Sequence, residues 1–219
     1  VRLKMHRPME GIPLKLTIRK DGRGRWFASI AVRLPDVFGP TSKGALGIDL
    51  GVENIATDSN GGVYGKVCPD RSARRKHIEH ALARQKRGSR RWRQTQKRLA
   101  RQRSREASAR RTRHFQLASK IVKSGPQIIC VENLQLRNMT RSAKGNIEEP
   151  GKNVRAKSGL NRSILDAGLA QFVQILTDKA ESAGRLVVMV DPRGTSQECS
   201  DCSKTVTKPL KQRWHSCSC

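Results

Sequence analysis

Four cysteines near the end of the printed sequence have the spacing of a metal site. Cys199 and Cys202 form a C-x2-C pair, fourteen residues follow, and Cys217 and Cys219 form a C-x-C pair. Four thiolates with this spacing typically hold a structural Zn²⁺ ion in a closed tetrahedral site. A redox-active C-x2-C motif is the alternative, but the second pair argues against it. His215 could replace one thiolate, and we interpret it as a neighbour of the site.

Two carboxylates at expected strand ends form a second candidate site. Asp49 lies in IDLG and Glu132 in VENL, each at the end of an apolar run in which an unpaired charge would be costly. Carboxylates from neighbouring strand ends can hold Mg²⁺, and two such ions ~3.5–4 Å apart can activate water and stabilise the leaving oxygen of a phosphodiester. An acid in this position can also be a simple turn former or helix cap, and that alternative stays open.

The charge of the chain indicates a polyanionic partner. Lys and Arg number 45 against 18 Asp and Glu, which gives the 219 residues a formal net charge of +27. Nucleic acid is the expected partner, and a membrane surface is the rival. The longest apolar runs, such as residues 186–190, are far shorter than the ~20 residues that span a bilayer. No signal peptide is visible, so we expect no membrane partner and a cytoplasmic location.

The basic residues concentrate between residues 70 and 113. This segment holds eighteen Lys and Arg and only three acids. Helix formers dominate it, and the break at Gly88-Ser89 predicts two basic helices in an arm at 70–124. Like charges at this density repel one another, and a polyanion would relieve the repulsion. The arginines that we expect to contact phosphates are Arg84, Arg87, Arg90, Arg91, Arg98 and Arg101.

The strands that would position the two carboxylates can be read from apolar runs and turns. A β module is expected at residues 1–43, with a hairpin signal at Asp21-Gly22. Residues 45–67 predict three short, consecutive antiparallel strands. The apolar run at 127–134 predicts a central strand covered on both faces. A last strand is expected at 185–190.

Helices are expected between these strands. A short amphipathic helix is predicted at 114–122, a polar loop at 140–159, and a longer helix from Ser163 to Ala183. Ser163 and Asp166 would form its capping box. Its apolar stripe would contain Leu165, Leu169, Phe172, Leu176 and Ala180.

A three-stranded meander that leads into parallel strands with crossover helices is the strand order of an RNase H-like fold. The predicted fold class is therefore α/β, an RNase H-like mixed sheet with a basic helical insertion, an N-terminal β module and a C-terminal zinc ribbon. The expected domains are the β module at 1–43, a nuclease domain at 44–194 and the ribbon at 195–219.

Five stretches of the sequence resemble the OrfB/TnpB family of insertion-sequence-encoded proteins, often called transposases. They are GIDLGVENIAT, IICVENLQLRNM, GLNRSILDAGLAQFVQIL, DKAESAGRLVVMVDPRGTSQECSDC and WHSCSC, in the family's order. The resemblance implies a RuvC-like nuclease, related to type V CRISPR effectors, that uses a guide RNA to select double-stranded DNA and cleaves it with Mg²⁺. By motif position, Asp49 and Glu132 resemble the first two catalytic carboxylates. The four cysteines resemble the zinc ligands of the target-binding ribbon, and the β module resembles the end of a wedge domain that contacts guide RNA.

The sequence departs from the family pattern at a few positions. The third catalytic Asp of the family follows the second cysteine pair, whereas the printed sequence ends at Cys219, and Asp191 is no match because it precedes the ribbon. Ser203 stands where Gly is common, and Leu169 where an aromatic residue is common. We expect a fragment lacking both ends that does not cleave as it stands, while the longer natural protein does.

Two functional hypotheses follow. The first is an RNA-guided DNA endonuclease of a mobile element, with Zn²⁺ as structural and Mg²⁺ as catalytic cofactor and with DNA and guide RNA as partners. The second is a non-catalytic nucleic-acid-binding regulator or transposition accessory protein on the same scaffold. A basic RNA-binding protein that carries a zinc ribbon would explain the charge but not the paired strand-end acids.

Overall fold

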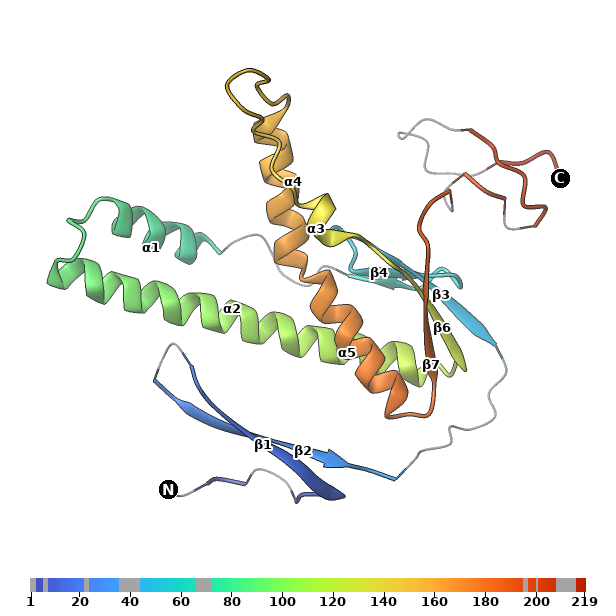
Figure 1. Cartoon of the computed structure of the whole chain (residues 1–219), viewed down its shortest axis with the longest axis horizontal. Helices are drawn as coiled ribbons and strands as arrows, with labels where there is room; N and C mark the ends of the chain where they lie inside the picture. The colour runs from blue at the N-terminus through green and yellow to red at the C-terminus, as the bar shows by residue number, and fades with distance from the viewer. Residues whose placement is uncertain are drawn as a thin grey trace.

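Two separate sheets organise the chain. A computed structural model describes residues 3–5, 8–21, 24–35, 44–65, 72–194, 197–199, 201–207 and 216–219. One sheet has two strands and the other has five, and helices pack against the larger one (Figure 1). In the part of the chain that these ranges cover, no helix has the length and apolar character needed to cross a membrane.

The smaller sheet is the predicted N-terminal hairpin. β1 (Ile12–Lys20) pairs with β2 (Trp26–Arg33) in antiparallel fashion. Asp21 and Arg25 close the turn, because the Asp21 amide donates to the Arg25 carbonyl at 2.8 Å and the Arg25 Nε donates to the Asp21 carboxylate at 2.8 Å. The hairpin signal at Asp21 is thus confirmed.

The larger sheet carries both predicted carboxylates. Its strands are β3 (Ala45–Leu50), β4 (Ala56–Asp58), β5 (Val63–Tyr64), β6 (Ile128–Glu132) and β7 (Leu186–Val190). They lie in the order β5-β4-β3-β6-β7, with antiparallel pairing from β5 to β3 and parallel pairing from β3 to β7. The predicted meander followed by parallel strands is therefore confirmed.

Alternation along the strands separates a core face from an open face. In β3 the buried residues are Leu46, Ile48 and Leu50, while Asp49 between them is exposed. In β6 only Ile129 and Val131 are buried, and the alternate positions are half-buried. The expectation that this central strand is covered on both faces is therefore wrong. A continuous apolar run indicates a buried strand, but the run contains a cysteine and ends in a glutamate, and both fall on the less covered face.

The basic segment forms two helices, as predicted. α1 (Ala73–Ala83) and α2 (Arg90–Lys123) begin at Ser72 and Ser89, whose side chains accept from backbone amides three residues later. Gly88 between them has φ +82°, in the region that favours glycine. The separate helix expected at 114–122 does not exist, because α2 contains neither Gly nor Pro and continues unbroken from the basic arm into the core.

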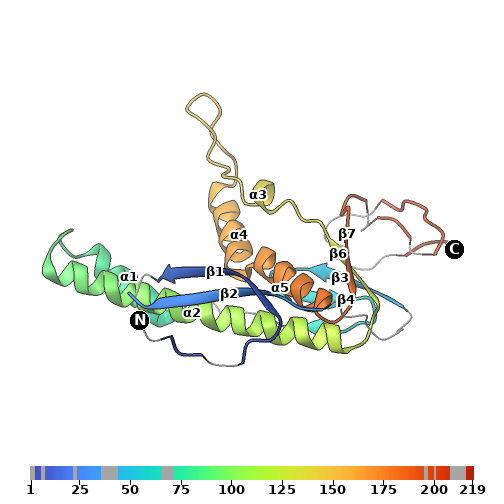
Figure 2. The same ribbon diagram turned by 60° about the horizontal axis from the view of Figure 1, so that its bottom comes forward.

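The long helix expected from Ser163 to Ala183 is two helices. α4 (Val154–Ala167) and α5 (Leu169–Glu181) meet at Gly168, where φ is +66°. The predicted capping box is wrong, since Ser163 lies within α4 and its hydroxyl donates to the Gly159 carbonyl at 3.3 Å. α4 also replaces the end of the expected polar loop. Before it, α3 (Leu136–Met139) follows β6, and the segment between α3 and α4 projects from the body in both views (Figure 2).

The break at Gly168 changes which side chains reach the core. Leu165 is 65% exposed, whereas the other four residues of the expected stripe are buried in α5. Those residues pack with the inner end of α2 and with the core face of the sheet, where Phe172 and Ile121 are fully buried. The stripe was correctly predicted only C-terminal to the break.

Two side chains of α2 hold the break between α4 and α5. Arg110 donates to the Asp166 carbonyl at 3.0 Å, and Nε2 of His114 lies 3.2 Å from the Ala167 carbonyl. Because a carbonyl only accepts, this nitrogen carries the hydrogen. Burial lowers the pKa of His114, so its ring is neutral, and its edge contacts the Phe172 ring at a centroid distance of 5.6 Å. The last carbonyls of α4 are thus satisfied by α2.

Gly168→Ala is expected to destabilise the protein by about 1–2 kcal/mol, because a Cβ disfavours the left-handed conformation. That Cβ would also lie 3.2 Å from the Arg110 side chain and 3.3 Å from His114. Gly159→Ala is the matched control, since Gly159 lies within α4 and its Cβ would meet no atom within 4 Å. It should stabilise the protein by about 0.5–1 kcal/mol. Urea unfolding of both variants gives the comparison, and an unchanged Gly168→Ala variant would contradict the role of the break.

Candidate functional site

The C-terminal edge of the parallel strands brings the two predicted carboxylates together. Ile48 of β3 pairs with Val131 of β6, and Asp49 and Glu132 are the next residue of each strand. Residues at equivalent positions of parallel neighbours point to the same face, and their strands lie ~4.8 Å apart. Each carboxylate residue is adjacent in its strand to a buried core residue. Because side chains alternate along a strand, both carboxylates lie on the open face. Asp49 is exposed and Glu132 is half-buried.

The glycine of IDLG closes the strand that carries Asp49. The Gly51 amide donates to the Ile55 carbonyl at 3.2 Å, which turns the chain from β3 into β4. A Cβ at Gly51 would lie 2.7 Å from the Asn54 carbonyl oxygen, so only glycine fits this turn without a shift. The turn therefore requires the glycine of IDLG, whether or not Asp49 takes part in catalysis.

A third acid lies at the same edge. β6 and β7 pair from Ile128 with Leu186 to Glu132 with Val190, and Asp191 follows directly. The Asn133 amide donates to the Val190 carbonyl at 2.8 Å and ties the two strand ends together. The Asp191 carboxylate accepts from the Arg193 amide at 3.1 Å, which is a local turn contact. Its position one residue beyond the partner of Glu132 could not be read from the sequence, because it depends on the β6–β7 register.

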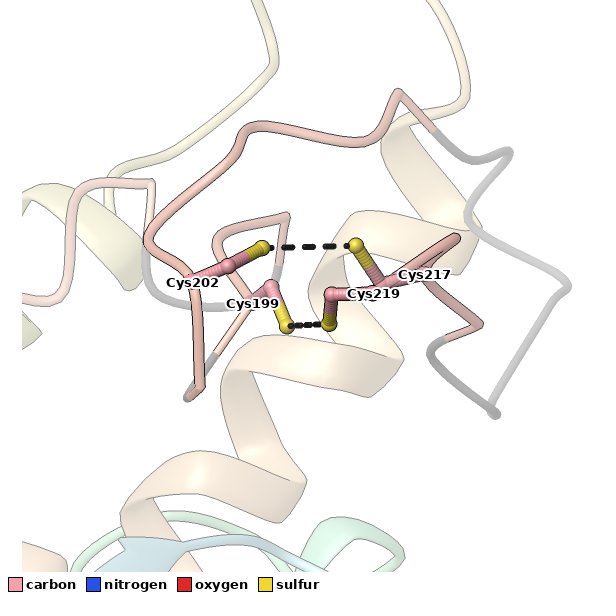
Figure 3. A group of neighbouring side chains, drawn as sticks. All are labelled: Cys199, Cys202, Cys217 and Cys219. Carbon is pink, nitrogen blue, oxygen red and sulfur yellow. Dashed lines mark hydrogen bonds between the residues drawn. The ribbon is translucent and has the colours of Figure 1, made fainter.

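The four predicted cysteines converge at the C-terminal end of the described chain (Figure 3). The Sγ atoms of Cys199 and Cys219 lie 3.5 Å apart, as do those of Cys202 and Cys217. All four Sγ atoms lie within 4.8 Å of one another. A tetrahedral site with metal–sulfur bonds of ~2.3 Å needs sulfur separations of ~3.8 Å. The cluster therefore has the dimensions to hold a metal ion, and each close contact joins one cysteine of each pair.

A tight turn presents the first cysteine pair. The Cys199 amide donates to the Lys204 carbonyl, and the Ser203 amide donates to the Cys199 carbonyl, both at 3.0 Å. Ser203 has φ +57°, in the left-handed region. Glycine adopts this conformation most readily, because it has no Cβ. His215 lies outside the described residues, so its predicted place beside the site stays a prediction.

The thiols of the cluster differ in acidity. Backbone amides of Cys202 and Asp201, together with other cysteines, lower the pKa of Cys199 to about 6. Hydrogen bonding with Cys199, Cys217 and Cys202 raises the pKa of Cys219 to about 12. Of these two thiols, Cys199 is therefore the first to become a thiolate. A cation bound among the sulfurs would favour the thiolate form of the others.

The basic arm leaves its arginines exposed because its acids are used internally. Arg75 of α1 contacts Glu79 at 3.2 Å and Glu106 of α2 at 3.1 Å, and Arg103 contacts Glu79 at 3.3 Å. The Ser72 hydroxyl also donates to Glu106 at 2.8 Å. These contacts join α1 to α2 and were missed by sequence reasoning, although the scarcity of acids in this segment was a usable signal.

All six predicted phosphate-contacting arginines lie on the exposed surface of the arm. They are Arg84, Arg87, Arg90, Arg91, Arg98 and Arg101. Exposure of cations without neighbouring acids is what a phosphate-binding surface requires. Their individual contacts stay predictions.

The fold and these sites define a class, an α/β protein with a four-thiol cluster able to hold a metal and a helical surface suited to polyanions. Residues 29–143 match the OrfB_IS605 family, described as "Probable transposase", and residues 170–219 match the Cas12f1-like TNB domain. The first match alone covers more than half of the chain. The chain belongs to the OrfB_IS605 "Probable transposase" family, which confirms the resemblance read from its motifs.

Two curated relatives resemble nearly the whole chain. The "Putative RNA-guided DNA endonuclease InsQ" of Escherichia coli (strain K12) is 33% identical over 209 residues, which cover 94% of this chain and 51% of that protein. The "Putative RNA-guided DNA endonuclease" of Streptomyces pristinaespiralis is 26% identical over 223 residues, with coverages of 99% and 52%. The chain spans about half the length of the curated relatives it matches.

Two solved structures are also similar. A cryo-EM structure of the Cas12f1–sgRNA–target DNA complex is 19% identical, covers 87% of this chain and 45% of that chain, and has a TM-score of 0.42. A cryo-EM structure of a CRISPR–Cas12f ternary complex is 18% identical, with coverages of 86% and 37% and a TM-score of 0.46.

Cys219→Ser is expected to weaken metal binding by at least about tenfold, because a hydroxyl is a poor substitute for a thiolate ligand. Competition with a chromophoric chelator measures the affinity. Cys130→Ser is the control, since Cys130 lies in β6 and outside the cluster. Metal affinity that is equal in the two variants would remove Cys219 from the ligand set.

Proposed function

We propose that the protein is an RNA-guided DNA endonuclease of a mobile element. The observation that carries the proposal is the β3–β6 register, which places Asp49 and Glu132 at adjacent positions on the open face of the sheet. Membership of the transposase family and the names of both curated relatives support it. The reaction would be hydrolysis of a phosphodiester at the edge where these carboxylates lie.

The strand order supports an RNase H-like, RuvC-like assignment of the larger sheet. Three antiparallel strands precede two parallel ones in the order β5-β4-β3-β6-β7. In this proposal the nuclease domain spans residues 44–194, with the basic helical arm at 70–124 as an insertion. Residues 1–43 form the β module, and residues 195–219 form the zinc ribbon.

The donor set at the sheet edge fits magnesium. Asp49 and Glu132 offer carboxylate oxygens, the ligands that Mg²⁺ prefers, and neither is enclosed in the core. When bound, Mg²⁺ supplies Lewis acidity that activates water and stabilises the leaving oxygen. The contribution of the chain is to hold both carboxylates on adjacent strands, so that the charges are in place before a phosphate arrives.

The cysteine cluster fits zinc in a structural role. Four sulfur donors are the ligand set of closed zinc sites, and catalytic zinc sites instead keep a position for water. With all four ligand positions supplied by Cys199, Cys202, Cys217 and Cys219, the site would hold the two cysteine pairs together. In this proposal the ribbon contributes to nucleic-acid binding.

The basic arm provides the proposed contacts to guide RNA and target DNA. The internal pairing of Glu79 and Glu106 leaves a helical surface on which cations outnumber acids. Such a surface binds phosphates without reading sequence. Sequence selection would then come from base pairing with the guide RNA.

Asp49→Asn and Glu132→Gln are each expected to lower cleavage of guide-matched DNA by more than about 100-fold, because removing one carboxylate weakens the hold on the catalytic cation. The assay uses the protein expressed from its complete reading frame, with its guide RNA and Mg²⁺, and follows plasmid linearisation on a gel.

Asp191→Asn is the matched control, since Asp191 lies at the same edge but is given no ligand role. It should retain most of the activity. Cleavage retained in Asp49→Asn would exclude Asp49 from the mechanism, and loss in Asp191→Asn would add Asp191 to the ligand set. Guide-dependent binding without any cleavage by the unaltered protein would favour the non-catalytic regulator.

Arg98→Gln is expected to reduce the slope of log affinity against log salt concentration by about 0.7–0.9, the share of one phosphate contact. Fluorescence anisotropy of a labelled DNA duplex over a series of salt concentrations measures it. Arg103→Gln is the comparison, because the Arg103 guanidinium already contacts Glu79 at 3.3 Å. A slope in Arg98→Gln equal to that of the unaltered protein would show that Arg98 contacts no phosphate.

A further inference from the structure

The outer face of α1 carries two histidines that no part of the proposed function uses, and they lie next to Arg84, one of the predicted phosphate contacts. His77, His80 and Arg84 are all exposed. With Ala81 they line an open depression of about 300 Å³. Residues three and four apart are neighbours on a helix, so the two imidazoles and the guanidinium lie along one strip.

The strip faces away from α2 and from the acids of the arm. Residues of α1 that contact α2 or are half-buried, such as Arg75, Ile78 and Glu79, lie on the opposite side of the helix. Glu79 is engaged by Arg75 and Arg103, and Glu106 of α2 by Arg75. The charged side chains that border the strip on α1 are Arg74 and Lys76, both exposed. Its surroundings are therefore positive.

We propose that His77, His80 and Arg84 form a binding site for a backbone phosphate of nucleic acid, strengthened by protonation of the two imidazoles. Imidazole is the side chain that normally changes charge between about pH 5 and 8. A phosphodiester held by Arg84 favours the protonated rings, and each protonated ring adds a charge-assisted donor. This inference rests on the proposed nucleic-acid-binding function and adds a pH dependence to it.

A metal site is the competing interpretation of two histidines on one helix turn. The positive surroundings argue against it, because a divalent cation would bind beside Arg74, Lys76 and Arg84, and no carboxylate of α1 itself borders the strip. The two interpretations also predict opposite pH dependences of ligand binding. Metal binding needs neutral imidazoles and weakens on acidification, whereas phosphate binding strengthens.

The test measures the affinity for a labelled DNA duplex of roughly 20 base pairs by fluorescence anisotropy at about pH 6 and about pH 8, at constant low salt. The unaltered protein should bind about tenfold more tightly at the lower pH, since a shift of one pKa unit on binding corresponds to a factor of ten. The double variant His77→Gln/His80→Gln should match the unaltered protein at the higher pH. The DNA affinity of the double variant should rise by no more than about twofold between the higher and the lower pH.

Lys76→Gln is the matched control for loss of a charge on the same helix. It should weaken binding at both pH values and leave their ratio unchanged. Arg84→Gln should weaken binding and also lower the ratio, because Arg84 holds the phosphate beside the two rings. An equal pH ratio in the unaltered protein and the double variant overturns the inference and leaves the proposed function standing. Tighter binding at the higher pH also overturns it, because protonation of the imidazoles would then oppose binding. No binding at either pH removes the proposed nucleic-acid-binding function and this site with it.

Discussion

Packing of α2 and α5 on one face of the five-stranded sheet is the constraint on which the other features depend. Fully buried residues of both helices, among them Ala118, Ile121, Phe172 and Leu176, meet the alternate residues of β3 and β6. Because side chains alternate along a strand, burial of one set commits the other set to the opposite face. Asp49 and Glu132 belong to that other set. The hydrophobic core therefore decides where the carboxylates point.

The continuity of α2 connects this core to the basic arm. One helix of 34 residues begins among exposed arginines and ends among buried aliphatic side chains. Along its length it uses Glu106 to hold α1, Arg110 and His114 to hold the break at Gly168, and Ile121 to fill the core. The orientation of the arm is therefore set by the same packing that orients the sheet. The few acids of the arm serve this architecture, so its cations remain available for a polyanion.

Local sequence signals were sufficient to predict an element wherever a residue determines the conformation of the backbone around it. The break at Gly88-Ser89, the hairpin at Asp21 and the sequence of antiparallel and parallel strands follow from turn chemistry and strand patterns. The break at Gly168 was missed because Leu169, Phe172 and Leu176 continue the apparent period of the preceding residues. Its left-handed conformation is favoured by contacts from Arg110 and His114, which lie more than fifty residues earlier. Such long-range contacts leave no periodic trace.

What the sequence by itself determined are the chemical types and their local spacing: four thiols in two close pairs, two acids at strand ends and a basic segment broken at one glycine. Tertiary structure decided which of them meet. The register between β3 and β6 set Asp49 beside Glu132, and the register between β6 and β7 brought Asp191 to the same edge. Tertiary structure also brought Cys199 to Cys219 and Cys202 to Cys217. Strand register, and which distant segments meet, depend on partners far apart in the sequence. Both are selected by burial of the whole core rather than by any one segment.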